Sequence, residues 1–244
     1  MNKKSYISLA NKAANIQINE LKKIKKIFNN AFIEAVDLIL NCKGKVIFAG
    51  IGKSGLIARK ISATFSSVGI PSFFCDPAQA LHGDMGQIEK KDILIIFSYS
   101  GNTSELTNML KYANRYRIKI IGVASKPESI LLKASDIKLI LPRVKEADVT
   151  GMVPTTSTTI TLLLGDCLAT TVMHQRNFSK EKFKVFHPGG NIGGSLLLAK
   201  DIMVTGKKMP VVNYKKKFKD VIKIMTQKKL GIVVILKNKF IKGI

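Results

Sequence analysis

The sequence predicts an α/β fold built on a doubly wound, five-stranded parallel sheet. Five short apolar segments rich in β-branched residues alternate with stretches of helical periodicity, and short loops join them. Alternation of this kind predicts parallel strands connected by crossover helices. Loops with glycine or hydroxyl side chains follow the first and third strands (residues 50–55 and 98–104), at the strand ends where such sheets bind ligands.

The elements follow from the periodicity. Residues 3–41 carry apolar side chains at helical spacing and predict one long N-terminal helix or two shorter ones. The five strands are expected at residues 45–49, 71–75, 93–97, 119–124 and 137–141. Helices are expected at 54–67, 103–116 and 156–176, with a short one after 127–129. Residues 177–199 are a polar, glycine-rich connection, and a Lys-rich segment with short strands follows, so we expect units at 1–199 and 200–244.

Composition narrows the class of protein. Hydrophobic residues make up 46% of the chain, but no apolar run approaches the roughly 20 residues of a membrane span. Residues 1–7 lack the apolar core of a signal peptide, so we expect a cytoplasmic protein with no membrane contact. Cys42, Cys75 and Cys167 are far apart and odd in number, which favours reduced thiols over disulfides or a metal site.

The net charge of +24 lies mostly at the two ends of the chain, with +6 in residues 1–26 and +11 in residues 200–244. It comes from 35 Lys and only 5 Arg, and the chain has no Trp. Nucleic-acid surfaces favour arginine and interleaved aromatic side chains, so we do not expect a nucleic-acid partner. The charge is compatible with faster capture of anionic substrates.

The first loop reads Gly50-Ile51-Gly52-Lys53-Ser54-Gly55 and opens a helix. It matches the dinucleotide-binding pattern Gly-x-Gly-x-x-Gly, and Asp76 lies near the end of the next expected strand, so a dehydrogenase is a competing interpretation. Lys53 and Ser54 instead suggest an anionic or polyhydroxyl ligand. A nucleotide triphosphatase is disfavoured, because Ile47 stands where that motif needs its first glycine.

The second loop reads Ser98-Tyr99-Ser100-Gly101-Asn102-Thr103-Ser104-Glu105, with a helix expected from about Asn102. Hydroxyls, unpaired backbone N–H groups and a helix dipole are the components of a phosphate site. The alternative is an ordinary N-capped turn.

In combination these loops resemble the sugar isomerase (SIS) domain, and the whole chain is similar to the arabinose 5-phosphate isomerases. Besides the two loops, the matching motifs are Leu81-His82-Gly83-Asp84, Lys145-Glu146-Ala147, Pro154-Thr155-Thr156-Ser157-Thr158-Thr159 and His187-Pro188-Gly189-Gly190. They run in family order and spacing over about residues 5–200. Residues 201–244 resemble the start of the family's cystathionine-β-synthase-type (CBS) tail, left incomplete.

The resemblance implies a flavodoxin-like SIS fold and the interconversion of D-ribulose 5-phosphate and D-arabinose 5-phosphate through an enediolate. The product would supply Kdo for lipopolysaccharide synthesis. It also implies a homotetramer with sites between subunits, a sugar phosphate as ligand, and no cofactor or metal. A non-catalytic SIS module that senses a sugar phosphate is the alternative. Catalysis is expected to lie within residues 1–199, and the strand expected at 231–236 would leave an open edge.

Family residues that map onto this chain give the expected site. The catalytic set is Lys53, Glu105, Glu146 and His187. Lys53 would neutralise oxyanion charge, either glutamate would move the C–H proton with a raised pKa, and His82 or His187 would open the ring or carry protons. The expected substrate contacts are His82, Gly52, Ser54, Ser98, Ser100, Gly101, Asn102 and Thr103. Residues 155–159 would cap the last helix or contact sugar hydroxyls.

Each residue also has an ordinary structural interpretation. Lys53 could be a solvated turn lysine, Glu105 a surface acid that complements a helix dipole, and His82 a partner of a backbone carbonyl. The chain also departs from the family pattern. Asp148-Val149 replaces the common Cys-Pro, and Gly194-Ser195 replaces a basic pair. Asp76 stands where a histidine is common, so an inhibitory metal contact would be absent.

Overall fold

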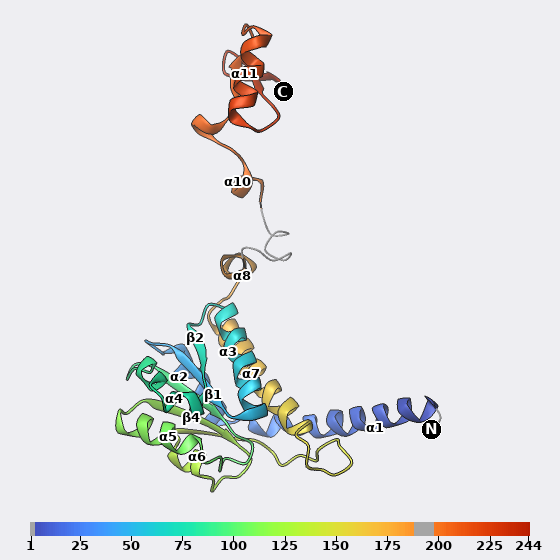
Figure 1. The fold of residues 1–244 in the computed structure, drawn as a ribbon, viewed down its shortest axis with the longest axis vertical. Helices are drawn as coiled ribbons and strands as arrows, with labels where there is room; N and C mark the ends of the chain where they lie inside the picture. The colour runs from blue at the N-terminus through green and yellow to red at the C-terminus, as the bar shows by residue number, and fades with distance from the viewer. Residues whose placement is uncertain (1–2, 188–197) are drawn as a thin grey trace. The chain divides into compact units, whose positions relative to one another are not determined.

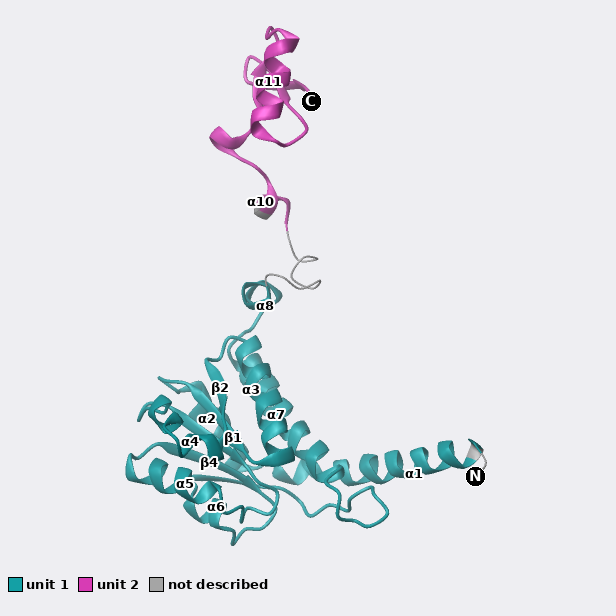
Figure 2. Cartoon of the chain, in the orientation of Figure 1, with its two compact units in different colours: residues 1–190 teal, residues 191–244 magenta. Residues whose placement is uncertain are grey.

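The computed structural model describes residues 3–187 and 198–244. The chain divides into two compact units, residues 1–190 and 191–244 (Figure 2). The boundary between them falls outside the described residues, so the domain limits expected from the sequence stay a prediction. The motif residues 188–190 and Gly194-Ser195 also lie outside the described residues.

Unit 1 contains a five-stranded sheet in the order β2-β1-β3-β4-β5, and every pair is parallel. The strands are β1 (Val46–Gly50), β2 (Ser72–Cys75), β3 (Ile93–Phe97), β4 (Lys119–Ala124) and β5 (Ile137–Ile140). This confirms the predicted fold class. The chain moves from β1 to one side for β2 and to the other side for β3, and Gly50 pairs with Phe97 at the last register position. The loops that follow β1 and β3 therefore start side by side, at the switch point of the sheet.

Helices cover both faces of this sheet (Figure 1). They are α1 (Lys3–Leu21), the 3-10 helix η1 (Lys22–Ile27), α2 (Asn30–Leu40), α3 (Gly52–Ser67), α4 (Pro77–Ala80), the 3-10 helix η2 (Asp84–Gln87), α5 (Leu106–Arg115), α6 (Ile130–Ala134), α7 (Thr156–Gln175) and α8 (Lys180–Phe186).

Successive side chains of a strand point to opposite faces, so β1, β3 and β4 each contribute to two cores. Phe48 and Ile95 pack in one core with residues of α2, α3 and α7. Ile47 and Leu94 pack in the other core with residues of α4, α5 and α6. Burial on both faces explains why these three strands read as continuous apolar runs, whereas β5 alternates between buried and exposed residues.

Three predicted boundaries differ from the structure. Helix α3 begins at Gly52 rather than Ser54, and α5 begins at Leu106 rather than near 103. The hydroxyls of the second loop bond to one another, which keeps residues 98–105 out of the helix. Helix α8 lies in the segment predicted as a plain connection. Ser179 accepts a hydrogen bond from the backbone N–H of Lys182, an N-cap whose signal was present in the sequence.

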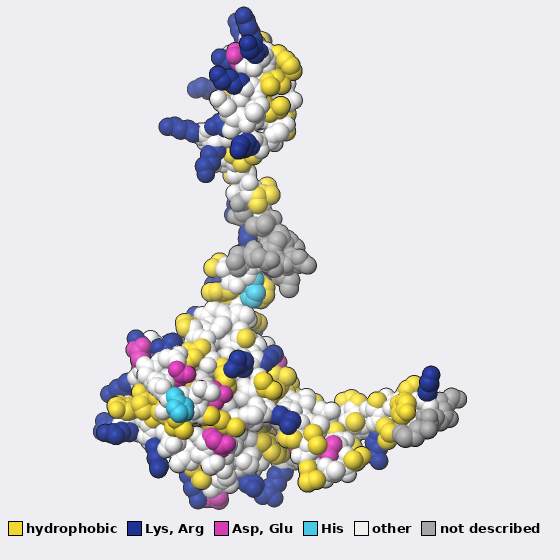
Figure 3. Space-filling view, viewed as in Figure 1, with side chains coloured by type: hydrophobic (Ala, Val, Ile, Leu, Met, Phe, Trp, Pro, Cys, Tyr) yellow, Lys and Arg dark blue, Asp and Glu magenta, His cyan; other side chains and the backbone are white. Residues whose placement is uncertain are grey.

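Unit 2 is small and lysine-rich. It contains α10 (Ala199–Ile202), the 3-10 helix η3 (Gly206–Lys208), β6 (Val211–Asn213), α11 (Phe218–Lys228), β7 (Val234–Lys237) and β8 (Phe240–Gly243). Strand β7 pairs with β6 on one side and β8 on the other, so the expectation that it forms an open edge was wrong. Lysines gather on one side of this unit and hydrophobic side chains on another (Figure 3).

No helix in the described part of the chain combines the length and the apolar character needed to span a bilayer.

Candidate active site

A pocket of about 470 Å³ lies at the carboxyl ends of β1 and β3. Its walls come from the first turns of α3 and α7, the loop after β3, and the segment between β5 and α7. The lining residues are Ile51, Lys53, Ser54, Ile57, Ser98, Tyr99, Ser100, Thr103, Val144, Glu146, Gly151, Met152, Pro154, Ser157, Thr158 and Thr161. The pocket thus lies where the strand order predicts a ligand site.

The glycines of the first loop allow β1 and α3 to approach closely. A Cβ atom on Gly55 would lie 2.6 Å from the carbonyl oxygen of Gly50. Gly52 has a φ of +58°, a left-handed conformation that turns the chain from the strand into the helix. As a result, Lys53 and Ser54 lie in the first turn of α3, where helix N–H groups and the positive end of the dipole can bind an anion.

The second loop is organised around Ser98 and Gly101. The hydroxyls of Ser98 and Thr103 lie 2.8 Å apart, and the Gly101 N–H donates to the Ser98 hydroxyl over 3.1 Å. Gly101 has a φ of +69°, and a Cβ there would overlap the hydroxyl oxygen of Ser129. Only glycine fits this turn. With these hydrogen bonds formed, the loop has Ser98, Ser100 and Thr103 on the pocket wall.

Glu146 caps the helix that forms the opposite wall. One carboxylate oxygen, Oε2, accepts hydrogen bonds from the Thr155 N–H (2.8 Å), the Thr155 hydroxyl (2.9 Å) and the Ser157 N–H (3.2 Å). Burial alone would raise the pKa of Glu146, but the hydrogen bonds from Ser157 and Thr155 outweigh it and the pKa is lowered. The carboxylate is therefore ionised at neutral pH.

Glu105 is exposed and does not line the pocket. Its pKa is lowered by its own backbone N–H and by the Ser104 hydroxyl, which donates to the carboxylate over 2.8 Å. The expectation of a raised pKa was therefore wrong for both Glu105 and Glu146. The physical reason is the same in each case, since N–H and O–H donors at a helix start stabilise the charged form.

His187 lies at the other end of the α3–α7 helix pair. It follows α8, whose Phe186 ring lies against Gly69 just beyond the end of α3. Arg176, which ends α7, donates to the carbonyl of the same Gly69 over 3.0 Å. Helix α7 has 20 residues and is therefore about 30 Å long, with the pocket at its first turn. The His187 ring stacks on Phe183 at 3.8 Å between centroids.

The structure thus brings about half of the expected site residues together in one pocket. The predicted residues that line the pocket are Lys53, Ser54, Ser98, Ser100, Thr103 and Glu146. Those outside its lining are Gly52, His82, Gly101, Asn102, Glu105 and His187. His82 lies exposed in the turn between α4 and η2. The Asn102 side chain accepts from the Ile130 N–H over 3.0 Å, so it joins the loop to α6.

Sequence reasoning missed the part played by Tyr99. Its hydroxyl accepts from the Val144 N–H over 2.9 Å and donates to the Pro142 carbonyl over 3.2 Å. Burial raises the pKa of Tyr99, which keeps the hydroxyl protonated and able to donate. An aromatic residue among small hydroxyl residues was the available signal, because a phenol buried in a loop needs a hydrogen-bond partner.

The pocket suits a small, anionic, polyhydroxylated ligand. Among the described residues that line it, Lys53 is the one cation and Glu146 the one carboxylate, and hydroxyl groups supply most other polar contacts. The described residues contain no group of three or more His, Cys, Asp or Glu side chains that could hold a metal ion.

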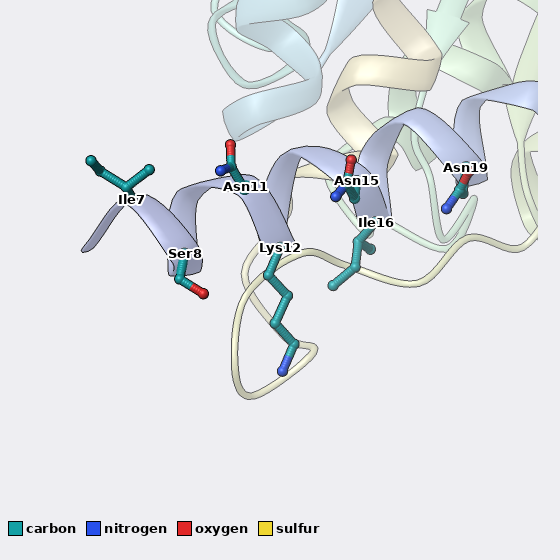
Figure 4. Close-up of a pocket in the computed structure, with 7 residues that line it drawn as sticks. All are labelled: Ile7, Ser8, Asn11, Lys12, Asn15, Ile16 and Asn19. Atoms are coloured by element: carbon teal, nitrogen blue, oxygen red, sulfur yellow. The ribbon is translucent and has the colours of Figure 1, made fainter. Parts of the chain in front are cut away.

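A wider hollow of about 640 Å³ runs along α1 (Figure 4). All its lining residues belong to that one helix, and Asn11, Asn15 and Asn19 recur at intervals of four. Among the described residues, no second element lines it, and no acid or histidine does so. It is a helix surface, and the pocket at the switch point is the candidate active site.

Comparisons with known proteins identify the family of this chain. The SIS domain family model matches residues 39–171. The arabinose 5-phosphate isomerase KdsD of Escherichia coli strain K12 is 41% identical over 226 residues, which cover 92% of this chain and 69% of that protein. An uncharacterised protein of Rickettsia prowazekii, RP505, is 39% identical over 96% of this chain and 73% of its own length. The solved structure of E. coli CFT073 c3406 in complex with arabinose 5-phosphate has a TM-score of 0.74 at 33% identity, covering 77% of this chain and 100% of that one.

Proposed function

This chain belongs to the SIS domain family, and from that premise we propose that it is an arabinose 5-phosphate isomerase. It interconverts D-ribulose 5-phosphate and D-arabinose 5-phosphate through an enediolate. The observation that carries the proposal is the pocket at the switch point, where one cation, one ionised carboxylate and a hydroxyl-rich loop meet.

The phosphate group fits the second loop. Ser98, Ser100 and Thr103 offer hydroxyls from one wall, as the expected site requires. Lys53 stands at the start of α3 and stabilises the negative charge that develops on the enediolate oxygens. The net positive charge of the chain favours capture of the dianionic substrate.

Glu146 is the better supported of the two candidate bases, because it lines the pocket and Glu105 does not. From the aldose, the base removes the C2 proton and returns a proton to C1, while a proton moves from the C2 hydroxyl oxygen to O1. A positioned base contributes about 10²–10⁴-fold to the rate. A carboxylate with a lowered pKa is a weak base, so stabilisation of the enediolate and substrate orientation must supply the larger share.

His187 is proposed to act in the pocket of a neighbouring copy. Its position at the far end of α7 supports this, since the helix alone separates it from its own pocket by about 30 Å. A homotetramer with sites between subunits, which the family resemblance implies, would bring the two ends together. There His187 or His82 opens the ring or carries the proton between O1 and O2.

The wider role follows from the reaction. We place the isomerase in the cytoplasm, where its product feeds Kdo and lipopolysaccharide synthesis, and the chemistry requires no cofactor, metal or redox step.

The deciding experiment is incubation with ribulose 5-phosphate in D₂O without added cofactor. Deuterium at C2 of arabinose 5-phosphate, read by NMR, is the expected result. Thermal stabilisation by the sugar phosphate without turnover would instead identify a sensing module and overturn the proposal.

A further inference from the structure

The segment from Pro142 to Ala147 carries Glu146 but belongs to no helix or strand. Side chains hold its backbone in place. Tyr99 bonds to the Pro142 carbonyl and to the Val144 N–H, and the Thr155 hydroxyl accepts from the Ala147 N–H over 2.9 Å. An irregular segment without ladder bonds depends on such contacts for its geometry.

The N-terminal helix α1 accepts a hydrogen bond from the backbone of Lys145, the residue before Glu146. The Glu20 carboxylate, in the last turn of α1, accepts from the Lys145 N–H over 2.9 Å. Its Oε2 atom also receives the Lys23 ammonium at 2.6 Å, and that ammonium lies 3.4 Å from the Arg143 carbonyl. The Glu20 side chain is only 18% exposed, although acids on surface helices are normally open to water.

The same part of α1 also contacts the helix that Glu146 caps. The Thr159 hydroxyl, in the first turns of α7, donates to the Gln17 side-chain oxygen over 2.9 Å. The end of α1 therefore bonds both to the Val144–Lys145 peptide unit, one residue before Glu146, and to the helix whose N-terminus receives the Glu146 carboxylate.

We propose that Glu20 is a positioning residue, which sets the place of the Glu146 carboxylate in the pocket through the Lys145 peptide N–H. The proposal rests on the proposed function for its kinetic consequence only. A displacement of about 1 Å in a reacting group can cost on the order of 10²-fold in rate, so the bond need not contribute much stability to matter.

The test compares E20A with E20Q, whose amide oxygen still accepts from Lys145. In E20A, kcat for the isomerase reaction should fall about tenfold or more while KM changes less than about threefold. E20Q should recover most of kcat. The matched control is E34A, which removes an exposed glutamate from α2, the next helix, and should behave as wild type.

Amide hydrogen exchange of the peptide spanning residues 143–147 gives a second readout that needs no turnover. Exchange there should be faster in E20A than in wild type, E20Q and E34A. If E20A does not fold, E20D replaces it, because the shorter side chain withdraws the carboxylate from Lys145 while keeping the charge.

Wild-type kcat and wild-type exchange in the folded variant would overturn the proposal. So would a loss of activity that only follows a loss of thermal stability and is equal in E20A and E20Q. Faster exchange in E20A together with no isomerase turnover by the wild type would refute the proposed function and support the positioning role.

Discussion

The two ends of the α3–α7 helix pair differ in what they bring together. At the first turns, Lys53 and Glu146 line one pocket with the hydroxyl loop, and Thr155 and Ser157 hold the Glu146 carboxylate in place. At the last turns, the Phe186 ring of α8 lies against Gly69 and His187 stacks on Phe183, about 30 Å away along α7. The family resemblance implies that Lys53, Glu146 and His187 share one site, whereas a single chain separates His187 from the other two. The role proposed for His187 therefore requires a second copy of the chain.

The largest effect is expected from complementation between two inactive variants, which tests whether His187 acts in the pocket of another copy. E146A and H187A should each lose about 10²–10⁴-fold in kcat when alone. Mixed oligomers made by co-expression should regain up to about a quarter of wild-type activity, because some sites then combine an intact pocket with an intact His187. The assay is turnover of ribulose 5-phosphate.

The matched control for complementation is a mixture of K53A and E146A, both altered at the same end. Each pocket then lacks one group, so no activity should return. Recovery in this control, or no recovery with E146A and H187A, would contradict sites shared between copies.

The rigidity of the pocket end can be tested through Gly101. G101A should destabilise the protein by about 2 kcal/mol or more, because the new Cβ would meet Ser129 in addition to the strain of a positive φ. G151A is the matched control, since Gly151 has the same φ of +69° but nothing within 4 Å. It should cost only about 1–2 kcal/mol. Urea unfolding measures both, and equal costs would show that the loop yields to the added carbon.

The charge of Glu146 at the pocket end predicts a pH dependence of stability. Its folded-state pKa is lowered from the ordinary 4.5, so the carboxylate contributes stability above that pH. The contribution is lost as the pH falls through the lowered pKa. Thermal unfolding of E146Q should therefore depend less on pH than wild type below about pH 5. Parallel profiles for the two proteins would refute the capping role of the charge.

The smallest effect is expected from unit 2. Deleting residues 200–244 should leave kcat within about twofold of wild type, because every described residue that lines the pocket belongs to unit 1. A collapse of turnover in a variant that still folds and assembles would show that the tail contributes to catalysis.

Much of the fold could be predicted because its signals are local. Apolar runs gave the five strands, and the loops after β1 and β3 were recognised from their glycines and hydroxyls. The predicted start of α5 was wrong. The Ser98 and Thr103 hydroxyls bond to each other, and the helix begins only after this loop. The expected rise in the pKa of Glu146 was wrong, because hydrogen bonds donated by Thr155 and Ser157 lower that pKa instead.

The sequence by itself determined the parallel sheet, the switch-point location of the candidate site, and the residue types that can bind a sugar phosphate. These depend on periodicity and on motifs in which neighbours in the chain are also neighbours in space. Only the tertiary structure decided which of those residues meet. It brought Glu20 of α1 to Lys145 across 125 positions and placed His187 at the opposite end from Lys53. Contacts between distant segments depend on how helices pack on the sheet, and no local pattern encodes that packing.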